Sequence, residues 1–149
     1  MKEIPSSTDQ LVVYGDFHGF TPEELFQYWI RPDLMTQWWP KIAEIDSRVG
    51  GAYRFSWPDQ NWFLQGIYGL LDPGKHLRFS WTWNHEPGVY EPLWVDVYFA
   101  EIDLGTRMSI FHGPYTDSES DQSARQGNIE GWIHFCSLLA GLRVGDPEC

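Results

Sequence analysis

The feature that most constrains the fold is a strict period of two in the middle of the chain. Residues 77–84 alternate between apolar and polar side chains, with Leu77, Phe79, Trp81 and Trp83 on one face and Arg78, Ser80, Thr82 and Asn84 on the other. A strand that alternates this sharply has one face on a core and one toward solvent, as in an antiparallel sheet. Such a sheet must cover its apolar face with another element.

Similar runs on both sides of this segment predict further strands, at 11–18, 44–49, 52–57, 62–71, 93–99 and 106–112. Gly50-Gly51 between two of these runs is typical of a tight hairpin turn. Thr21-Pro22-Glu23-Glu24 predicts a helix start, with Thr21 as N-cap and Glu24 completing a capping box. That helix should end before Pro32, and a second short one should span 33–39, before Pro40.

The last predicted element is a long helix from about Ser118 or Ser123 to Leu142, whose apolar stripe includes Trp132 and Phe135. The order therefore predicts an α+β fold: a curved antiparallel sheet wrapped around one C-terminal helix, with two short helices after the first strand. The domain should span 11–142, with tails at 1–10 and 143–149. A single helix cannot fill the concave side of a bent sheet, so we expect a cavity between them.

Composition limits the functions open to this chain. Its formal net charge of −11 argues against binding to nucleic acid or to an anionic membrane surface. Its nine Trp, seven Tyr and nine Phe are more rings than a core of this size requires. Either the interior is unusually aromatic, or some rings line a cavity or an interface.

The two cysteines, Cys136 and Cys149, cannot build a disulfide framework. The first ten residues are polar and lack the apolar segment of a signal peptide. No apolar run approaches the ~18 residues that a membrane span requires. We therefore expect a reduced, cytoplasmic protein that does not enter a membrane.

Several short motifs, in this order and spacing, resemble one family. They are TPEELF at 21–26, WW at 38–39, VGGAYRF at 49–55, the segment 66–73, LRFSWTW at 77–83, VDV at 95–97, GTRMSIFH at 105–112 and GW at 131–132. Together they resemble the START-like superfamily, also called SRPBCC or birch-pollen-allergen-like. Within it, the chain is similar to the family named after the activator of the heat-shock-protein-90 ATPase.

The resemblance implies a helix-grip fold with a hydrophobic pocket. Members bind lipids, sterols or aromatic small molecules, a few relatives are cyclases or hydrolases, and eukaryotic namesakes stimulate a chaperone. Those chaperone activators carry a further domain ahead of this one, for which this sequence offers no counterpart, so the expectation is against a chaperone partner. The family has no invariant catalytic motif to carry over.

The leading hypothesis is a non-catalytic module that binds a small apolar or aromatic molecule. We expect its ligand-binding residues to be Trp39, Tyr53, Phe55, Trp57, Trp81, Trp83, Val97, Met108, Ile110, His112, Asn128, Trp132 and Phe135. His112 shares a strand face with Met108 and Ile110. It could be a hydrogen-bonded core histidine, a ligand contact or, in the enzyme alternative, a general base.

Other polar residues point to no chemistry. Glu130 and His134 lie four apart on the helix and are expected to form a solvated contact, and Asp96 is expected to be exposed. The histidines lack ligand spacing, so no metal and no cofactor is predicted. Two alternatives remain, a cyclase or hydrolase that uses His112 and a chaperone-activating interaction module, and self-association stays open.

Overall fold

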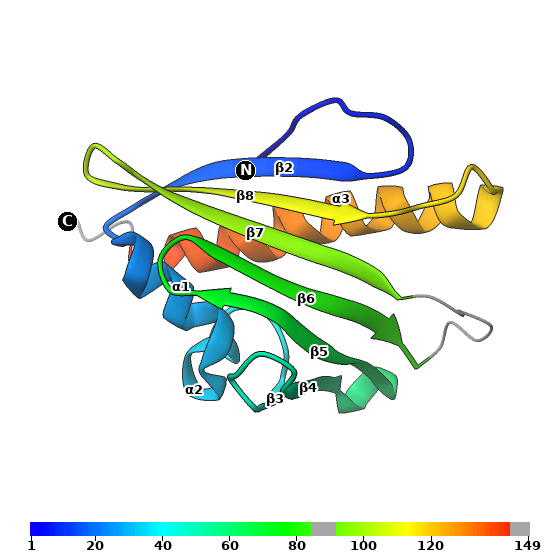
Figure 1. Cartoon of the computed structure of the whole chain (residues 1–149), viewed down its shortest axis with the longest axis horizontal. Helices are drawn as coiled ribbons and strands as arrows, with labels where there is room; N and C mark the ends of the chain where they lie inside the picture. Colours follow the sequence, from blue (N-terminus) through cyan, green and yellow to red (C-terminus); the bar gives the residue numbers. More distant parts are fainter. Residues whose placement is uncertain (85–91, 144–149) are drawn as a thin grey trace.

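The computed structural model describes residues 1–84 and 92–143, and one curved sheet dominates it (Figure 1). Eight strands are hydrogen-bonded in the order β1-β2-β8-β7-β6-β5-β4-β3, and every neighbouring pair is antiparallel. The elements are β1 (Lys2–Glu3), β2 (Leu11–His18), α1 (Pro22–Ile30), α2 (Pro32–Met35), β3 (Ile42–Ile45), β4 (Ala52–Trp57), a 3-10 helix (Pro58–Gln60), β5 (Trp62–Asp72), β6 (His76–Trp83), β7 (Leu93–Ile102), β8 (Gly105–Gly113) and α3 (Glu119–Gly141).

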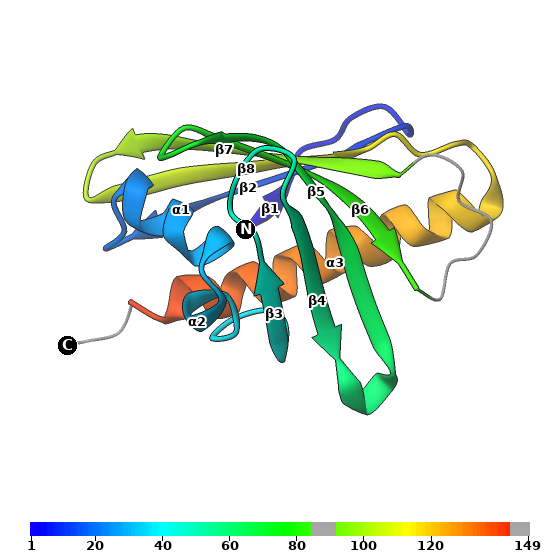
Figure 2. The ribbon, with the colours of Figure 1, turned by 60° about the horizontal axis from the view of Figure 1, so that its bottom comes forward.

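The long helix α3 crosses the concave side of this sheet. In Figure 2, β7, β8 and β2 lie over the helix, whereas β4 and β5 bend down past its side. Helices α1 and α2 lie at the end of the sheet near the C-terminal end of α3 (Figure 2). The α+β helix-grip prediction is therefore confirmed, including the two short helices after the strand that begins at Leu11.

The start of α1 is held by the predicted capping box. The Oγ1 of Thr21 accepts a hydrogen bond from the backbone N–H of Glu24 at 3.1 Å, and Glu24 Oε1 accepts from the N–H of Thr21 at 3.0 Å. Helix α2 is shorter than predicted and ends at Met35. The indole of Trp38 donates to the carbonyl of Tyr28 at 2.9 Å, and this tertiary bond holds the residues after Met35 in a turn.

Two further expectations about local structure were wrong. Strand β3 ends at Ile45, so Gly50-Gly51 closes a longer connection instead of forming a two-residue turn. Gly50 has φ of +82°, and a Cβ on Gly51 would collide with the carbonyl oxygen of Asp46. Residues 1–10 were expected to form a tail, but Lys2–Glu3 pairs with β2. Of the predicted tail at 143–149, residues 144–149 lie outside the described residues, as does the predicted loop at 85–91.

The period-two pattern of β6 is confirmed in the core. Leu77, Phe79 and Trp81 are buried in one continuous apolar cluster with residues from α1, β2, β4, β7, β8 and α3. Ser80 is also buried although it lies on the other face, because Gly66 on β5 lets the strands approach closely there. The core thus fills the space between the sheet and the C-terminal half of α3.

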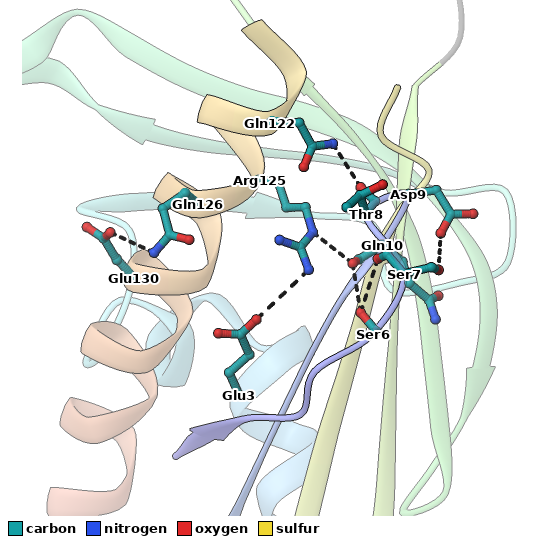
Figure 3. Close-up of polar contacts among 10 residues, drawn as sticks. All are labelled: Glu3, Ser6, Ser7, Thr8, Asp9, Gln10, Gln122, Arg125, Gln126 and Glu130. Atoms are coloured by element: carbon teal, nitrogen blue, oxygen red, sulfur yellow. Dashed lines mark hydrogen bonds and ion pairs between the residues drawn. The ribbon is translucent and has the colours of Figure 1, made fainter. Parts of the chain in front are cut away.

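The N-terminal segment ties the first half of α3 to the β1–β2 edge (Figure 3). Arg125 donates from Nε to the carbonyl of Gln10 at 2.9 Å and lies 3.9 Å from a carboxylate oxygen of Glu3. One turn earlier, the amide of Gln122 donates to the carbonyl of Thr8 at 2.9 Å. This flank of the helix is therefore anchored by polar contacts, and the opposite flank faces β4–β6.

Candidate functional site

A cavity of about 330 Å³ lies on the flank of α3 that faces β4–β6. It is lined by Trp39, Trp57, Gln60, Trp62, Trp81, Trp83, Gly127, Asn128, Gly131, Trp132 and Phe135. Six of these residues are tryptophans, and we call the space the indole cavity. No Lys, Arg, Asp, Glu or His is among the described residues that line it.

Three buried indoles form the floor of the indole cavity. The rings of Trp39 and Trp81 are stacked, with centroids 5.8 Å apart and planes 19° apart. Trp132 on α3 packs against both, at 5.0 Å from Trp39 and 5.5 Å from Trp81. Because these rings come from three elements, the floor joins α3 to the sheet and to the segment after α2.

The rim is made by indoles that are partly exposed. Trp57 and Trp62 flank the 3-10 turn between β4 and β5, and each packs against Trp83, at 5.3 and 6.0 Å. Trp62 is 45% exposed. Gln60 is exposed in the same turn. The rim therefore opens the cavity to solvent at the β4–β5 turn.

The helical wall is built from small residues. Gly127 and Gly131 lie one turn apart, and a Cβ on either would meet no atom within 4 Å. Glycine inside a helix is less favourable than alanine by about 0.8–1.0 kcal/mol. The side-chain amide of Asn128 donates to the hydroxyl of Tyr115 at 2.8 Å, which fixes the orientation of that amide. The two glycines keep open a space that larger side chains would fill.

His112 lies behind the floor instead of lining the cavity. It is 1% exposed, and its Nδ1 accepts a hydrogen bond of 3.1 Å from the indole Nε1 of Trp132. The proton of the neutral ring is therefore on Nε2, which has no hydrogen-bond partner among the described residues. Burial lowers the pKa of His112 to about 3. The ring stays uncharged near neutral pH and supports Trp132 and Trp81, whose centroid is 4.4 Å away.

The structure divides the predicted ligand-binding residues into two groups. The group that lines the cavity is Trp39, Trp57, Trp81, Trp83, Asn128, Trp132 and Phe135. The group that packs elsewhere in the core is Tyr53, Phe55, Val97, Met108, Ile110 and His112. Tyr53 shows why: its hydroxyl donates to the carbonyl of Ser80 at 2.6 Å, and burial raises its pKa.

Sequence reasoning missed four lining residues, namely Gln60, Trp62, Gly127 and Gly131. The glycines did carry a signal, because two glycines four apart inside a predicted helix share a face. Trp62 carried a weaker one, as a large aromatic residue next to a turn. Gln60 carried none that we can identify.

Two expectations about polar residues are corrected by the structure. Asp96 is not exposed: its side chain is 18% exposed and accepts from Arg78 at 2.6 Å while it contacts Nε2 of His76 at 2.7 Å. Glu130 accepts a hydrogen bond from Gln126, and the ring of His134 packs on Phe135.

No group of three or more His, Cys, Asp or Glu within 1–84 and 92–143 could hold a metal ion.

The fold and the cavity together define a class of protein: a helix-grip domain of the ligand-binding type. The sequence profile of one family matches residues 20–142, and its description is activator of Hsp90 ATPase homolog 1-like protein. The chain belongs to this family, as its motifs suggested. No functionally curated protein matches the sequence. In the described part of the chain, no helix is long and apolar enough to cross a membrane.

Solved structures share the fold at low sequence identity. A protein from Rhodobacter sphaeroides matches with a TM-score of 0.79 and 19% identity over 95% of both chains. One from Mesorhizobium loti has a TM-score of 0.77 and 22% identity, over 89% of this chain and 95% of that one. A solution structure described as the Aha1 dimer from Colwellia psychrerythraea has a TM-score of 0.72 and 14% identity, over 91% and 97%.

Proposed function

We propose that this protein binds a small apolar or aromatic molecule in the indole cavity and does not transform it. The observation that carries the proposal is an open space of about 330 Å³ whose walls are mostly aromatic. Small-molecule sites of about 300–1,000 Å³ lined by apolar side chains with a few polar groups are typical of proteins that bind such ligands. Here the polar groups are the amides of Gln60 and Asn128.

Affinity would come mainly from removing apolar ligand surface from water. That transfer contributes about 25 cal/mol for each Å² buried, before the costs of association are subtracted. The floor is already packed ring against ring, so its indoles need little reordering when a ligand enters. A preformed site lowers the entropy cost of binding.

The same contacts support a binding role over an enzymatic one. A general acid or base must reach the substrate within about 3 Å, directly or through one water. The described lining holds no titratable side chain, and His112 lies behind Trp132 with a lowered pKa of about 3. An enzyme would therefore need acid–base groups beyond those in the described part of this wall.

The test uses N-phenyl-1-naphthylamine, an uncharged aromatic dye whose emission rises in apolar surroundings. We expect saturable binding at one site, with energy transfer from the cavity indoles. Gly131→Leu should remove it, because the new side chain projects into the cavity from α3. Gly141→Leu is the matched control: it also has free space and lies on α3, but outside the lining, so it should bind normally. Binding that survives Gly131→Leu would refute the proposed site.

Self-association is a second candidate property, favoured by the Colwellia relative described as a dimer. Exposed aromatic surface on the convex side of the sheet, at Tyr98 and its neighbour Phe111, offers a contact area away from the cavity. Light scattering over a range of protein concentrations should give a mass near twice that of one chain. A constant single-chain mass would contradict a dimer.

A further inference from the structure

We propose that the indole cavity prefers ligands that carry a weakly hydrated cation, such as a quaternary ammonium or another fully alkylated amine, over uncharged ligands of the same shape. This inference rests on the proposed function, since it names the class of molecule that the same site would take. It follows from what the walls present to a ligand.

The first argument is the number and arrangement of the indoles. A cation over an aromatic face is attracted by the ring quadrupole, and tryptophan is the strongest of the aromatic partners. The cavity has six indoles from five separate segments, so a ligand inside it is surrounded by rings on several sides. Their planes are not parallel: Trp81 and Trp83 are perpendicular at 90°, and Trp39 and Trp132 are tilted by 54°. Faces tilted in this way can approach one compact charge from different directions.

The second argument is the direction of an indole N–H. The positive edge of an indole repels a cation, and the N–H is its most positive point. In the floor, the N–H of Trp132 is turned to Nδ1 of His112, behind the cavity. His112 itself adds no positive charge there, because burial lowers its pKa to about 3. The groups behind the floor therefore do not oppose a cationic ligand.

The third argument is the charge of the protein. No Lys or Arg is among the described residues of the lining, so a carboxylate or phosphate would enter without a counter-charge. The whole chain carries a formal net charge of −11, which raises the concentration of cations near its surface. Both facts disfavour an anionic ligand and favour a cationic one.

The fourth argument concerns hydration. A primary ammonium has three N–H donors and loses strong hydration when it is buried. Among side chains, the described wall offers only two acceptors, the amide oxygens of Gln60 and Asn128, against the three donors of a primary ammonium. These acceptors cannot replace the hydration of a primary ammonium. Alkyl groups remove the donors and present an apolar surface, which matches the rings.

The experiment compares three probes in displacing N-phenyl-1-naphthylamine, two of nearly equal shape and a third that lacks the three methyl groups. They are benzyltrimethylammonium, its uncharged analogue neopentylbenzene, and benzylammonium. We expect benzyltrimethylammonium to bind at least about tenfold more tightly than neopentylbenzene, and benzylammonium to bind more weakly than benzyltrimethylammonium. Equal or tighter binding of neopentylbenzene would overturn the cation preference and leave the proposed function intact. If the dye itself does not bind, the proposed function fails as well.

A variant pair separates the ring face from apolar volume. Trp62→Leu removes one partly exposed rim indole and keeps an apolar side chain there. It should weaken benzyltrimethylammonium several-fold while neopentylbenzene changes less than about twofold. Trp94→Leu, an indole outside the cavity beneath Arg78, is the control and should change neither. If Trp62→Leu lowered the affinity for both probes equally, the indole would supply only apolar contact area, and the cation preference would be contradicted at this residue.

Discussion

The indole Nε1 of Trp132 donates a hydrogen bond of 3.1 Å to Nδ1 of His112, and both side chains are buried. The bond joins α3 to β8 directly under the indole cavity. It also selects the tautomer of His112, because an Nδ1 that accepts must lack a proton. The floor of the site and the strand behind it are therefore one hydrogen-bonded unit.

This arrangement predicts acid sensitivity well above the range in which carboxylates titrate. Burial lowers the pKa of His112 to about 3, below its ordinary value of 6.5. At higher pH both folded and unfolded chains hold a neutral ring, so its contribution is constant. As pH falls below 6.5, only the unfolded chain takes up the proton, and the free energy of unfolding should drop by about 1.4 kcal/mol per pH unit. Urea denaturation at pH 7.5, 6.0 and 5.0 measures this slope.

A pair of variants assigns that slope to one histidine. His112→Gln should flatten it, because glutamine does not titrate, while its amide oxygen can still accept from Trp132. His134→Gln changes an exposed histidine on α3 and should leave the slope as it is. A slope that persists in His112→Gln would contradict the assignment.

Filling the helical wall should stabilise the protein and weaken binding. Gly127→Ala and Gly131→Ala each add a methyl group into open space and remove a helix-disfavouring residue. Each should raise the free energy of unfolding by about 0.8–1.0 kcal/mol. The dye affinity should fall, since both methyl groups project into the cavity. Gly141→Ala, at the end of α3 and away from the lining, should leave dye affinity unchanged; equal losses in all three variants would contradict the location of the site.

The half-buried polar contacts of Asp96 should contribute more to stability than an exposed ion pair does. Asp96 contacts both Arg78 and His76 on the convex face of the sheet, and Arg78 also lies over the ring of Trp94. Asp96→Asn should lower the free energy of unfolding by about 1–3 kcal/mol. Asp46→Asn removes the exposed pair with Arg48 and should cost less than about 0.5 kcal/mol. If both variants lowered the free energy of unfolding by similar amounts, partial burial would not strengthen the contacts of Asp96.

The capping box of α1 should stabilise the fold measurably. Thr21→Ala removes the acceptor of the Glu24 N–H and should cost about 1 kcal/mol in urea denaturation. The reciprocal bond, from the backbone N–H of Thr21 to the carboxylate of Glu24, lowers the pKa of Glu24. The stability that this second bond supplies should therefore be lost as pH falls through that lowered pKa. Thr8→Ala, an exposed threonine outside any helix, serves as the control and should change stability little.

The sequence predicted those elements whose signals are local. The alternation in β6 and the capping box of α1 need only neighbouring residues, and both are confirmed. The end of α2 depends on the bond from Trp38 to Tyr28, ten residues away, and was mispredicted. The connection before β4 depends on how closely Gly51 approaches Asp46, which the Gly-Gly pair alone does not reveal.

Membership of the cavity was harder to predict, because the phase of a strand tells which face a residue is on but not how far along the bend it lies. Trp81 and Trp83 share a face, yet Trp81 is in the floor and Trp83 at the rim. Phe55 and Trp57 share a face in the same way, but only Trp57 reaches the cavity. The curvature that separates them is set by the whole sheet, which no short pattern encodes.

The two margins of the sheet bear on how copies of this chain could meet. One margin is β1, with two residues, and the other is β3, with four. A free margin invites strand addition by another molecule, and very short border strands limit the ladder that an incoming chain could extend. Two copies would then have to associate through side chains on a face of the sheet. Contacts of that kind add no strand to the sheet and so do not lead to fibre-like growth.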